Sequence, residues 1–145
     1  MEAPFPTSAD ADRSEVMSAN FTKYYLPDGR VLHHFTAAND AEYHDHPFPF
    51  DSTIGPDPAG GYTEEILTHA SPGCWRMQTM QRLPGATHRV EAGTIHRLTG
   101  LLGRECWTVI TPGAKEREPG FYRIAEQGLS HRFWFESDWH PWPRA

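Results

Sequence analysis

The sequence lacks several features that would assign it to a membrane or nucleic-acid-binding class. None of its 145 residues belongs to an apolar run approaching the roughly 20 residues of a bilayer-spanning helix. There is no run of lysine or arginine, and the formal net charge of −6 gives no sign of a basic face for nucleic acid. The first residues lack the basic start and apolar stretch of a secretory signal, so a cytoplasmic location is the default expectation.

Cysteine is also scarce, since the chain contains only Cys74 and Cys106. Without a CxxC spacing the two could pair, stay free or flank a pocket. In a chain expected to be cytoplasmic, free buried thiols are the default.

Helical periodicity is missing as well, because no stretch of helical length repeats its apolar residues every 3.6 positions. Thirteen prolines and twelve glycines instead divide the chain into short segments at spacings of about ten residues. One pair of such segments flanks Pro27, Asp28 and Gly29, which is typical of a hairpin. The pattern predicts one all-β domain, a sandwich or barrel.

The two ends of the chain differ in composition from the middle. Residues 1–20 mix proline, serine, alanine and acids without a period, which predicts a flexible N-terminal arm with at most a short helical turn. Residues 21–145 form the expected domain. Its tail holds Trp134, Trp139 and Trp142, and we expect these rings to pack back over the domain or to cover a partner subunit.

The segment AEYHDHPFPF contains the first candidate functional residues. His44 and His46 are separated by one residue, and in a strand such residues point to the same side. Two imidazoles on one side can share a metal ion, because imidazole is a common ligand for zinc, iron, copper and nickel.

A second motif lies downstream in GATHRVEAGTIHRL. Gly85, Glu91, Gly93 and His96 reproduce the order and spacing of the second cupin motif, with Glu91 in the place of its proline. The glycine before the last strand suits a tight turn with positive φ. HDH fits the HxH of the first cupin motif. Between residues 30 and 142 the chain resembles a group of small single-domain metal-binding cupins from bacteria and phages.

This resemblance implies a single cupin barrel, that is, a jelly roll or double-stranded β-helix, with His44, His46 and His96 as metal ligands. The usual glycine before the first histidine is Ala38 here, and the usual glutamate after the second histidine is missing. In the group that the chain resembles, the acidic ligand lies in GGYTE and maps to Glu64. Asp51 and Glu65 are the alternatives: strand alternation turns Asp51 away unless a proline introduces a bulge, and Glu65 would face inward if the register slipped by one.

Other polar residues have weaker claims on the site. His88 could line the pocket, although a solvent-facing or hydrogen-bonded position is expected. His33 and His34 occupy opposite sides of one strand, so one of them at most faces inward. Arg76 is a candidate anion anchor only if its side of the strand is internal.

Asp45 and Tyr62 are candidate supports for the ligands. A set of remaining residues is expected to be structural or solvated: His69, His131, His140, Lys115, Glu116 and Arg117.

Three histidines and one carboxylate suit Fe(II), zinc, nickel or manganese without distinguishing among them. We expect a mononuclear metal enzyme that acts on a small molecule, with Fe(II) and oxygenase-type chemistry favoured, although no 2-oxoglutarate signature is matched. The alternatives are a metal-dependent lyase, isomerase or hydrolase, and a non-catalytic cupin that binds or senses a small ligand. Cupins commonly pair through edge strands, and a homodimer is expected; no nucleic acid or membrane partner is indicated.

Overall fold

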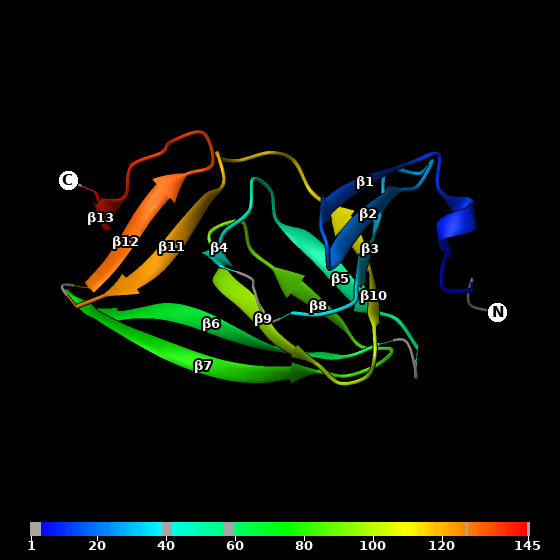
Figure 1. The fold of residues 1–145 in the computed structure, drawn as a ribbon, viewed down its shortest axis with the longest axis horizontal. Coiled ribbons are helices and arrows are strands. Elements are labelled where there is room, and N and C mark those ends of the chain that lie inside the picture. Colours follow the sequence, from blue (N-terminus) through cyan, green and yellow to red (C-terminus); the bar gives the residue numbers. More distant parts are fainter. Residues whose placement is uncertain (1–3, 39–41, 57–59, 127, 145) are drawn as a thin grey trace.

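Two antiparallel β-sheets make up most of the chain (Figure 1). The structure is a computed structural model that describes residues 4–38, 42–56, 60–126 and 128–144. Within these ranges the only helical element is a 3₁₀ turn, Ser8–Asp10, and no helix is long and apolar enough to cross a bilayer. The predicted all-β class is confirmed.

The first sheet has six strands and lies toward the N-terminal end of the molecule in Figure 1. In spatial order its strands are β1 (Arg13–Ser18), β2 (Phe21–Tyr25), β3 (Val31–Phe35), β10 (Cys106–Pro112), β5 (Phe50–Ile54) and β8 (Thr87–Val90). The expected hairpin is present: β2 pairs with β3 around Gly29, whose φ of 92° is a conformation that glycine tolerates best.

The second sheet has seven strands and curls strongly. In spatial order these are β13 (His140–Trp142), β12 (Gly128–Phe133), β11 (Gly120–Ala125), β4 (Tyr43–His44), β9 (Ile95–Leu101), β6 (Tyr62–Ser71) and β7 (Cys74–Arg82). β12 also contacts β7, so the ends of the sheet approach each other. Figure 1 shows β11 and β12 converging with β6 and β7 at one end of the molecule.

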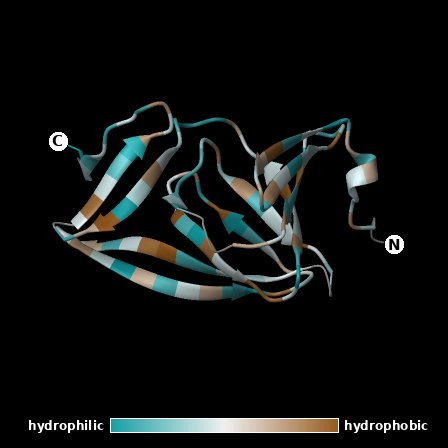
Figure 2. Cartoon of the chain, viewed as in Figure 1, coloured by the Kyte–Doolittle hydropathy of each residue, from teal (hydrophilic) through white to brown (hydrophobic). Residues whose placement is uncertain are grey.

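Alternation along the strands builds the core, and Figure 2 shows hydrophilic and hydrophobic residues following one another along the long strands. One buried cluster joins the two sheets: Ile54, Tyr62 and Cys106, with Phe35, Leu98 and Leu101 packed against it. Another draws only on the seven-stranded sheet and fills its curl: Tyr43, Leu67, Ile95, Tyr122 and Leu129. Opposite sides of that sheet therefore bury different sets of residues.

The N-terminal segment differs from the expectation of an arm without strands. Residues Arg13–Ser18 form β1, which pairs with β2 at the edge of the six-stranded sheet. All six β1 residues are exposed, so the strand is held by backbone pairing and carries no apolar alternation that the sequence could display. Phe5 and Ala11 pack against Leu32 and its neighbours. The first three residues lie outside the described part of the chain, and flexibility of the arm stays a prediction.

The aromatic tail folds back, as expected, but only in part. β13 pairs with β12, and Trp142 packs against the cluster inside the curl. Trp139 lies under the guanidinium of Arg123, 4.3 Å from its ring centre. Trp134 and Phe135 remain exposed, at 57% and 60% of their surface.

Candidate metal centre

Three histidines from separate parts of the sequence meet at the junction of β4 and β9. His44 lies on β4 and pairs directly with His96 on β9, while His46 follows β4 and donates its backbone N–H to the Ala92 carbonyl oxygen at 2.9 Å. One ring nitrogen from each histidine lies within 4.8 Å of the others. The structure thus brings together all three histidines that the sequence singled out as ligands.

Hydrogen bonds at the far side of two of these rings orient them. His44 Nδ1 lies 2.8 Å from the Glu42 carbonyl oxygen, and His96 Nδ1 lies 2.7 Å from Glu64 Oε2. Since both partners are acceptors, each Nδ1 carries the hydrogen and each Nε2 presents a lone pair. This is the arrangement in which a metal-ligating histidine is fixed by a partner behind it. His46 packs its ring against Phe50, at 4.8 Å between centres.

The spacing of the His46 and His96 nitrogens fits a shared ion. His46 Nε2 and His96 Nε2 are 3.3 Å apart. Two nitrogens bound at about 2.1 Å to one ion, at angles near 100°, lie about 3.2 Å apart. His46 Nδ1 is buried and has no hydrogen-bond partner within the described residues. The group therefore fits a divalent metal by donor type, and the His46–His96 pair also fits it by separation.

Burial keeps the His44 and His46 rings in the neutral form that binds metals. It is the main cause that lowers the pKa of His44 to about 4, and the neighbouring His96 acts in the same direction. Burial, followed by His96 and His44, holds the pKa of His46 well below its ordinary value. At neutral pH both rings are unprotonated, so little proton release would accompany ligation.

Glu64 is the acidic residue that reaches the site, but it lies behind His96 and outside the group of three. It is 1% exposed; its Oε2 contacts His96 Nδ1, and its Oε1 accepts a hydrogen bond from Arg82 Nε at 2.5 Å. Burial alone would raise the pKa of Glu64, but His96 and Arg82 outweigh it and lower that pKa. Direct ligation by Glu64 stays a prediction, since both its oxygens are engaged here.

The two alternative acids lie elsewhere. Asp51 is half-exposed and approaches Arg89 at 3.6 Å, in keeping with the alternation that turns it away from His46. Glu65 pairs with Arg97 at 2.8 Å. Strand alternation therefore separates Glu64 from both of them.

One residue of the site, Arg82, escaped the sequence analysis. Arg76 is exposed, whereas Arg82, on the same side of β7 by alternation, carries the contact to Glu64. His88 takes the hydrogen-bonded position that was expected as one alternative: it is half-buried, and its Nε2 lies 3.5 Å from the Tyr62 hydroxyl. The sequence did not decide which side of β7 faces inward. Arg82 lies on the same side as Met80, two residues further along the strand, and extending that side would have found it.

Asp45 points away from the three imidazoles and anchors β4 from the other side. Its buried carboxylate accepts hydrogen bonds from the Gly120 N–H and the Tyr122 hydroxyl, both at 2.7 Å, and pairs with Arg117 at 2.8 Å. Burial raises the pKa of Asp45 against the opposite effect of these donors. Arg117, expected to be solvated, is instead the counter-charge of a buried acid.

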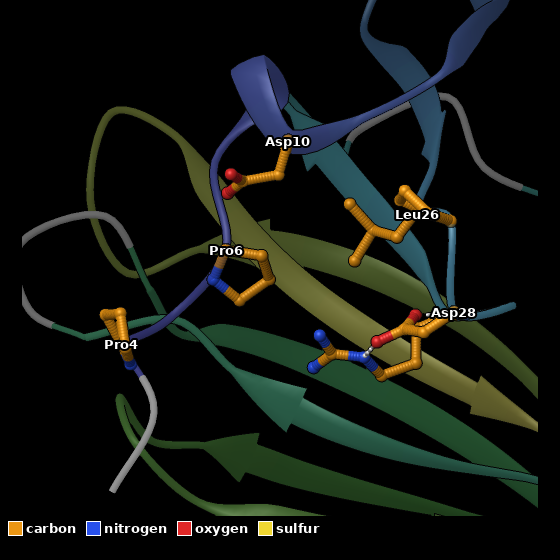
Figure 3. A pocket seen from close by; sticks show the side chains of 7 residues that line it. Pro4, Pro6, Asp10, Leu26 and Asp28 are labelled. Carbon is orange, nitrogen blue, oxygen red and sulfur yellow. Dashed lines mark hydrogen bonds and ion pairs between the residues drawn. The ribbon is translucent and has the colours of Figure 1, made fainter.

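Two surface depressions, each of about 420 Å³, lie outside the histidine group. One is shown in Figure 3 beside the N-terminal segment, where Pro4, Pro6 and Leu26 line it and Arg30 is bound to Asp28. The other opens inside the curl of the seven-stranded sheet and is lined in part by Trp75, Trp142 and Arg117. Neither depression includes a residue of the three-histidine group.

Comparison with known proteins identifies the fold. No protein-family model matches the chain, and no curated protein matches it. The chain is similar to the solved structure of an oxalate oxidase, with a TM-score of 0.55 and 14% identity over 81% of this chain and 62% of that one. It is also similar to the DMSP lyase DddQ from Ruegeria pomeroyi DSS-3, with a TM-score of 0.51 and 17% identity over 79% of this chain and 58% of that one.

A third similar structure is the polyketide cyclase RemF from Streptomyces resistomycificus, with a TM-score of 0.51 and 15% identity over 94% of this chain and 89% of that one. The chain spans less than two thirds of the oxalate oxidase and DMSP lyase chains. These neighbours are cupin-fold proteins, and at such identities the likeness concerns the fold alone. The protein has the cupin fold, a jelly-roll barrel, and carries three histidines that could hold a metal ion.

Proposed function

We propose that the protein is a metal-dependent enzyme in which His44, His46 and His96 hold one divalent ion that acts on a small molecule. The observation that carries this proposal is the convergence of the three rings, with nitrogens within 4.8 Å of one another. Two of the rings are already oriented from behind by Glu42 and Glu64. The solved structures with a similar fold include an oxidase and a lyase, which is consistent with catalysis without specifying it.

Fe(II) and oxygenase-type chemistry are the first candidates. Held by the three histidines, an Fe(II) ion would supply a place where oxygen and a chelating small molecule could both bind. The protein residues bind and orient: Glu64 holds the His96 ring, Arg82 holds Glu64, and Phe50 packs against the His46 ring. The phenyl ring beside His46 keeps water from one side of the site.

Metal analysis of the untagged protein tests the proposal. We expect one equivalent of metal in the wild type and a loss of at least about tenfold in affinity in His44→Ala, His46→Ala and His96→Ala. His69→Ala is the matched control, because His69 is exposed and contacts Trp75 instead of the three rings. Absence of metal from the wild type, or equal metal in all variants, would contradict the assignment.

The identity of the metal decides the chemistry. Iron, with oxygen uptake that depends on an added chelating substrate, would support the oxygenase. Zinc or nickel, with turnover under anaerobic conditions, would indicate Lewis-acid lyase or isomerase chemistry at the same ion. Tight binding of a small ligand that is recovered unchanged would indicate a sensing or binding protein.

A further inference from the structure

One of the only two lysines in the chain lies on the inner side of the six-stranded sheet. Lys23 is on β2, where it pairs with His33 on β3, and the adjacent pairs on the same side are Phe21 with Phe35 and Tyr25 with Val31. Directly paired residues of antiparallel strands point to the same face. Lys23 and His33 therefore share a face.

That face looks toward the three histidines. Phe35 packs against the buried cluster that joins the two sheets, so its side of β3 is the inner side. Val31, on the same side, packs against the cluster that contains Phe50, and the Phe50 ring contacts His46. Since His33 lies between Val31 and Phe35, Lys23 is carried on the wall that faces the candidate metal centre.

The electrostatics agree with this placement. The pKa of His33 falls to about 3, mainly through burial and then through Lys23. Burial also lowers the pKa of Lys23 itself, against the effect of Glu15.

Lys23 has no close ion pair within the described residues, although the charge of Glu15 acts on it across β1 and β2. It forms no ion pair within 4.0 Å there, and its Nζ lies 5.9 Å from the centre of the Phe21 ring. Glu15, its neighbour across β1 and β2, accepts a hydrogen bond from the Tyr25 hydroxyl at 3.0 Å. For Lys23 burial outweighs the effect of Glu15, so the half-buried ammonium group carries a desolvation cost that a bound anion would offset.

Other cations around the site are already committed. Arg82 is bound to Glu64 and Arg117 to Asp45. Lys115, the second lysine, is 63% exposed and pairs with Glu118 at 2.8 Å. Lys23 is thus distinguished from these three by facing the site without a carboxylate within 4.0 Å among the described residues.

We propose that Lys23 binds the carboxylate of a small anionic substrate whose other end reaches the three histidines. The inference rests on the proposed function for the role of the ion, and it adds the chemical class of the substrate. A short carboxylate fits because an ammonium group pairs with it as a compact point charge, while Phe21 and Phe35, stacked 4.4 Å apart beside His33, offer apolar contact for its carbon atoms.

Calorimetric titration of the full-length, zinc-loaded protein with propionate and propionamide tests the proposal. The two probes have similar shape and differ in charge. We expect propionate to bind at least about tenfold more tightly than propionamide, and Lys23→Met to weaken propionate binding by about tenfold or more. Lys23→Arg should keep most of the affinity, and Lys115→Met, the matched control, should leave it unchanged. Equal propionate affinity in Lys23→Met and the wild type would overturn the proposal.

A second measurement separates this proposal from the metal assignment. In metal-free wild type, propionate should slow acylation of Lys23 by an amine-directed reagent several-fold relative to Lys115, as read by mass spectrometry of peptides. If the protein binds no metal but propionate still protects Lys23, the anion site is supported and the proposed metal-dependent function fails. Full metal content with neither protection nor a Lys23→Met effect would remove the anion site alone. Thermal unfolding of each variant checks that it is folded.

Discussion

The residues around the three histidines divide into those that present nitrogens and those that hold the rings. Glu64 belongs to the second set in this structure, since its carboxylate bridges His96 and Arg82 in a region where it is almost fully buried. A carboxylate bound behind a ligating imidazole fixes the tautomer and increases the basicity of the opposite nitrogen. The acid can thus strengthen the site without touching the ion.

Replacement of Glu64 tests this role. We expect Glu64→Gln to lower metal affinity by about 10- to 100-fold, because the His96 ring loses its charged partner, and to leave the number of protein ligands unchanged. Chelator competition measures the affinity, and X-ray absorption of the zinc-loaded protein counts the ligands. Glu65→Gln is the control, since Glu65 pairs with Arg97. Loss of one oxygen ligand in Glu64→Gln would instead establish direct ligation.

His131 provides a pH-dependent contribution to stability away from the site. It is completely buried between Tyr122 and Trp142, and burial, followed by the charge of Arg144, lowers its pKa to about 4. The unfolded chain, with a histidine pKa near 6.5, binds more protons in this range than the folded protein does. The contribution of His131 is therefore present above about pH 6.5 and is lost as pH falls toward 4.

Denaturant unfolding at intervals from pH 7 to pH 4.5 measures this loss. We expect the wild type to lose free energy of unfolding more steeply than His131→Phe, which has no proton to bind. An NMR titration of the imidazole signals checks the low pKa directly. A His131 resonance that titrates near 6.5 would contradict the prediction.

The short element β4 is held from both of its faces. His44 and His46 point toward the candidate metal centre, whereas Asp45 reaches Gly120 and Tyr122 on β11 and Arg117 in the preceding loop. β11 has little space to move at this point, because a Cβ on Gly120 would come within 2.4 Å of His131 Nε2. The position of the two histidines thus depends on contacts that lie on the opposite side of the sheet.

Asp45→Ala should destabilise the protein and weaken the metal site together. Removing the carboxylate leaves Arg117 and the Tyr122 hydroxyl without their acceptor, and we expect a loss of about 2–3 kcal/mol in the free energy of unfolding. Denaturant titration measures the loss, and metal analysis follows the site. The matched control is Asp51→Asn, whose exposed pairing with Arg89 should contribute less than about 0.5 kcal/mol. Equal stability of the two variants would argue against the anchor.

Local patterns in the sequence were sufficient for most strands and for the three histidines. Alternation and turn residues identified the hairpin around Gly29, and the HDH and glycine–histidine spacings identified the three histidines that the structure brings together. β1 could not be found in this way, because its exposed residues follow no apolar period. Arg82 and Arg117 acquire their roles from acids 18 and 72 residues away in the chain, and a local window contains no signal of such pairing.

Over the whole molecule, the two sheets differ in what they contribute. The seven-stranded sheet supplies the histidines, and the six-stranded sheet supplies the facing wall with Lys23 and His33. The aromatic tail closes part of the curl with Trp142 and leaves Trp134 and Phe135 exposed side by side, with ring centres 5.7 Å apart. Exposed neighbouring aromatic rings are typical of surfaces that bind another protein chain.

A homodimer stays a prediction, with this aromatic pair as its contact. We expect sedimentation velocity to show a dimer for the wild type and a shift toward monomer for Trp134→Glu, because a charge would be buried without a partner. Val16→Glu, at another exposed apolar position on β1, is the control for added charge alone. A monomeric wild type at all concentrations would contradict the prediction.

The tripeptide His44–Asp45–His46 also has a consequence for genetic experiments. Its middle residue faces Tyr122 and its outer residues face His96, so one short segment serves two layers of the molecule. A mutational scan scored on activity alone would find all three positions equally intolerant and would suggest three ligands. Scoring cellular abundance in parallel would separate them: substitutions at the middle position would deplete the protein, and those at the outer positions would leave its amount largely intact.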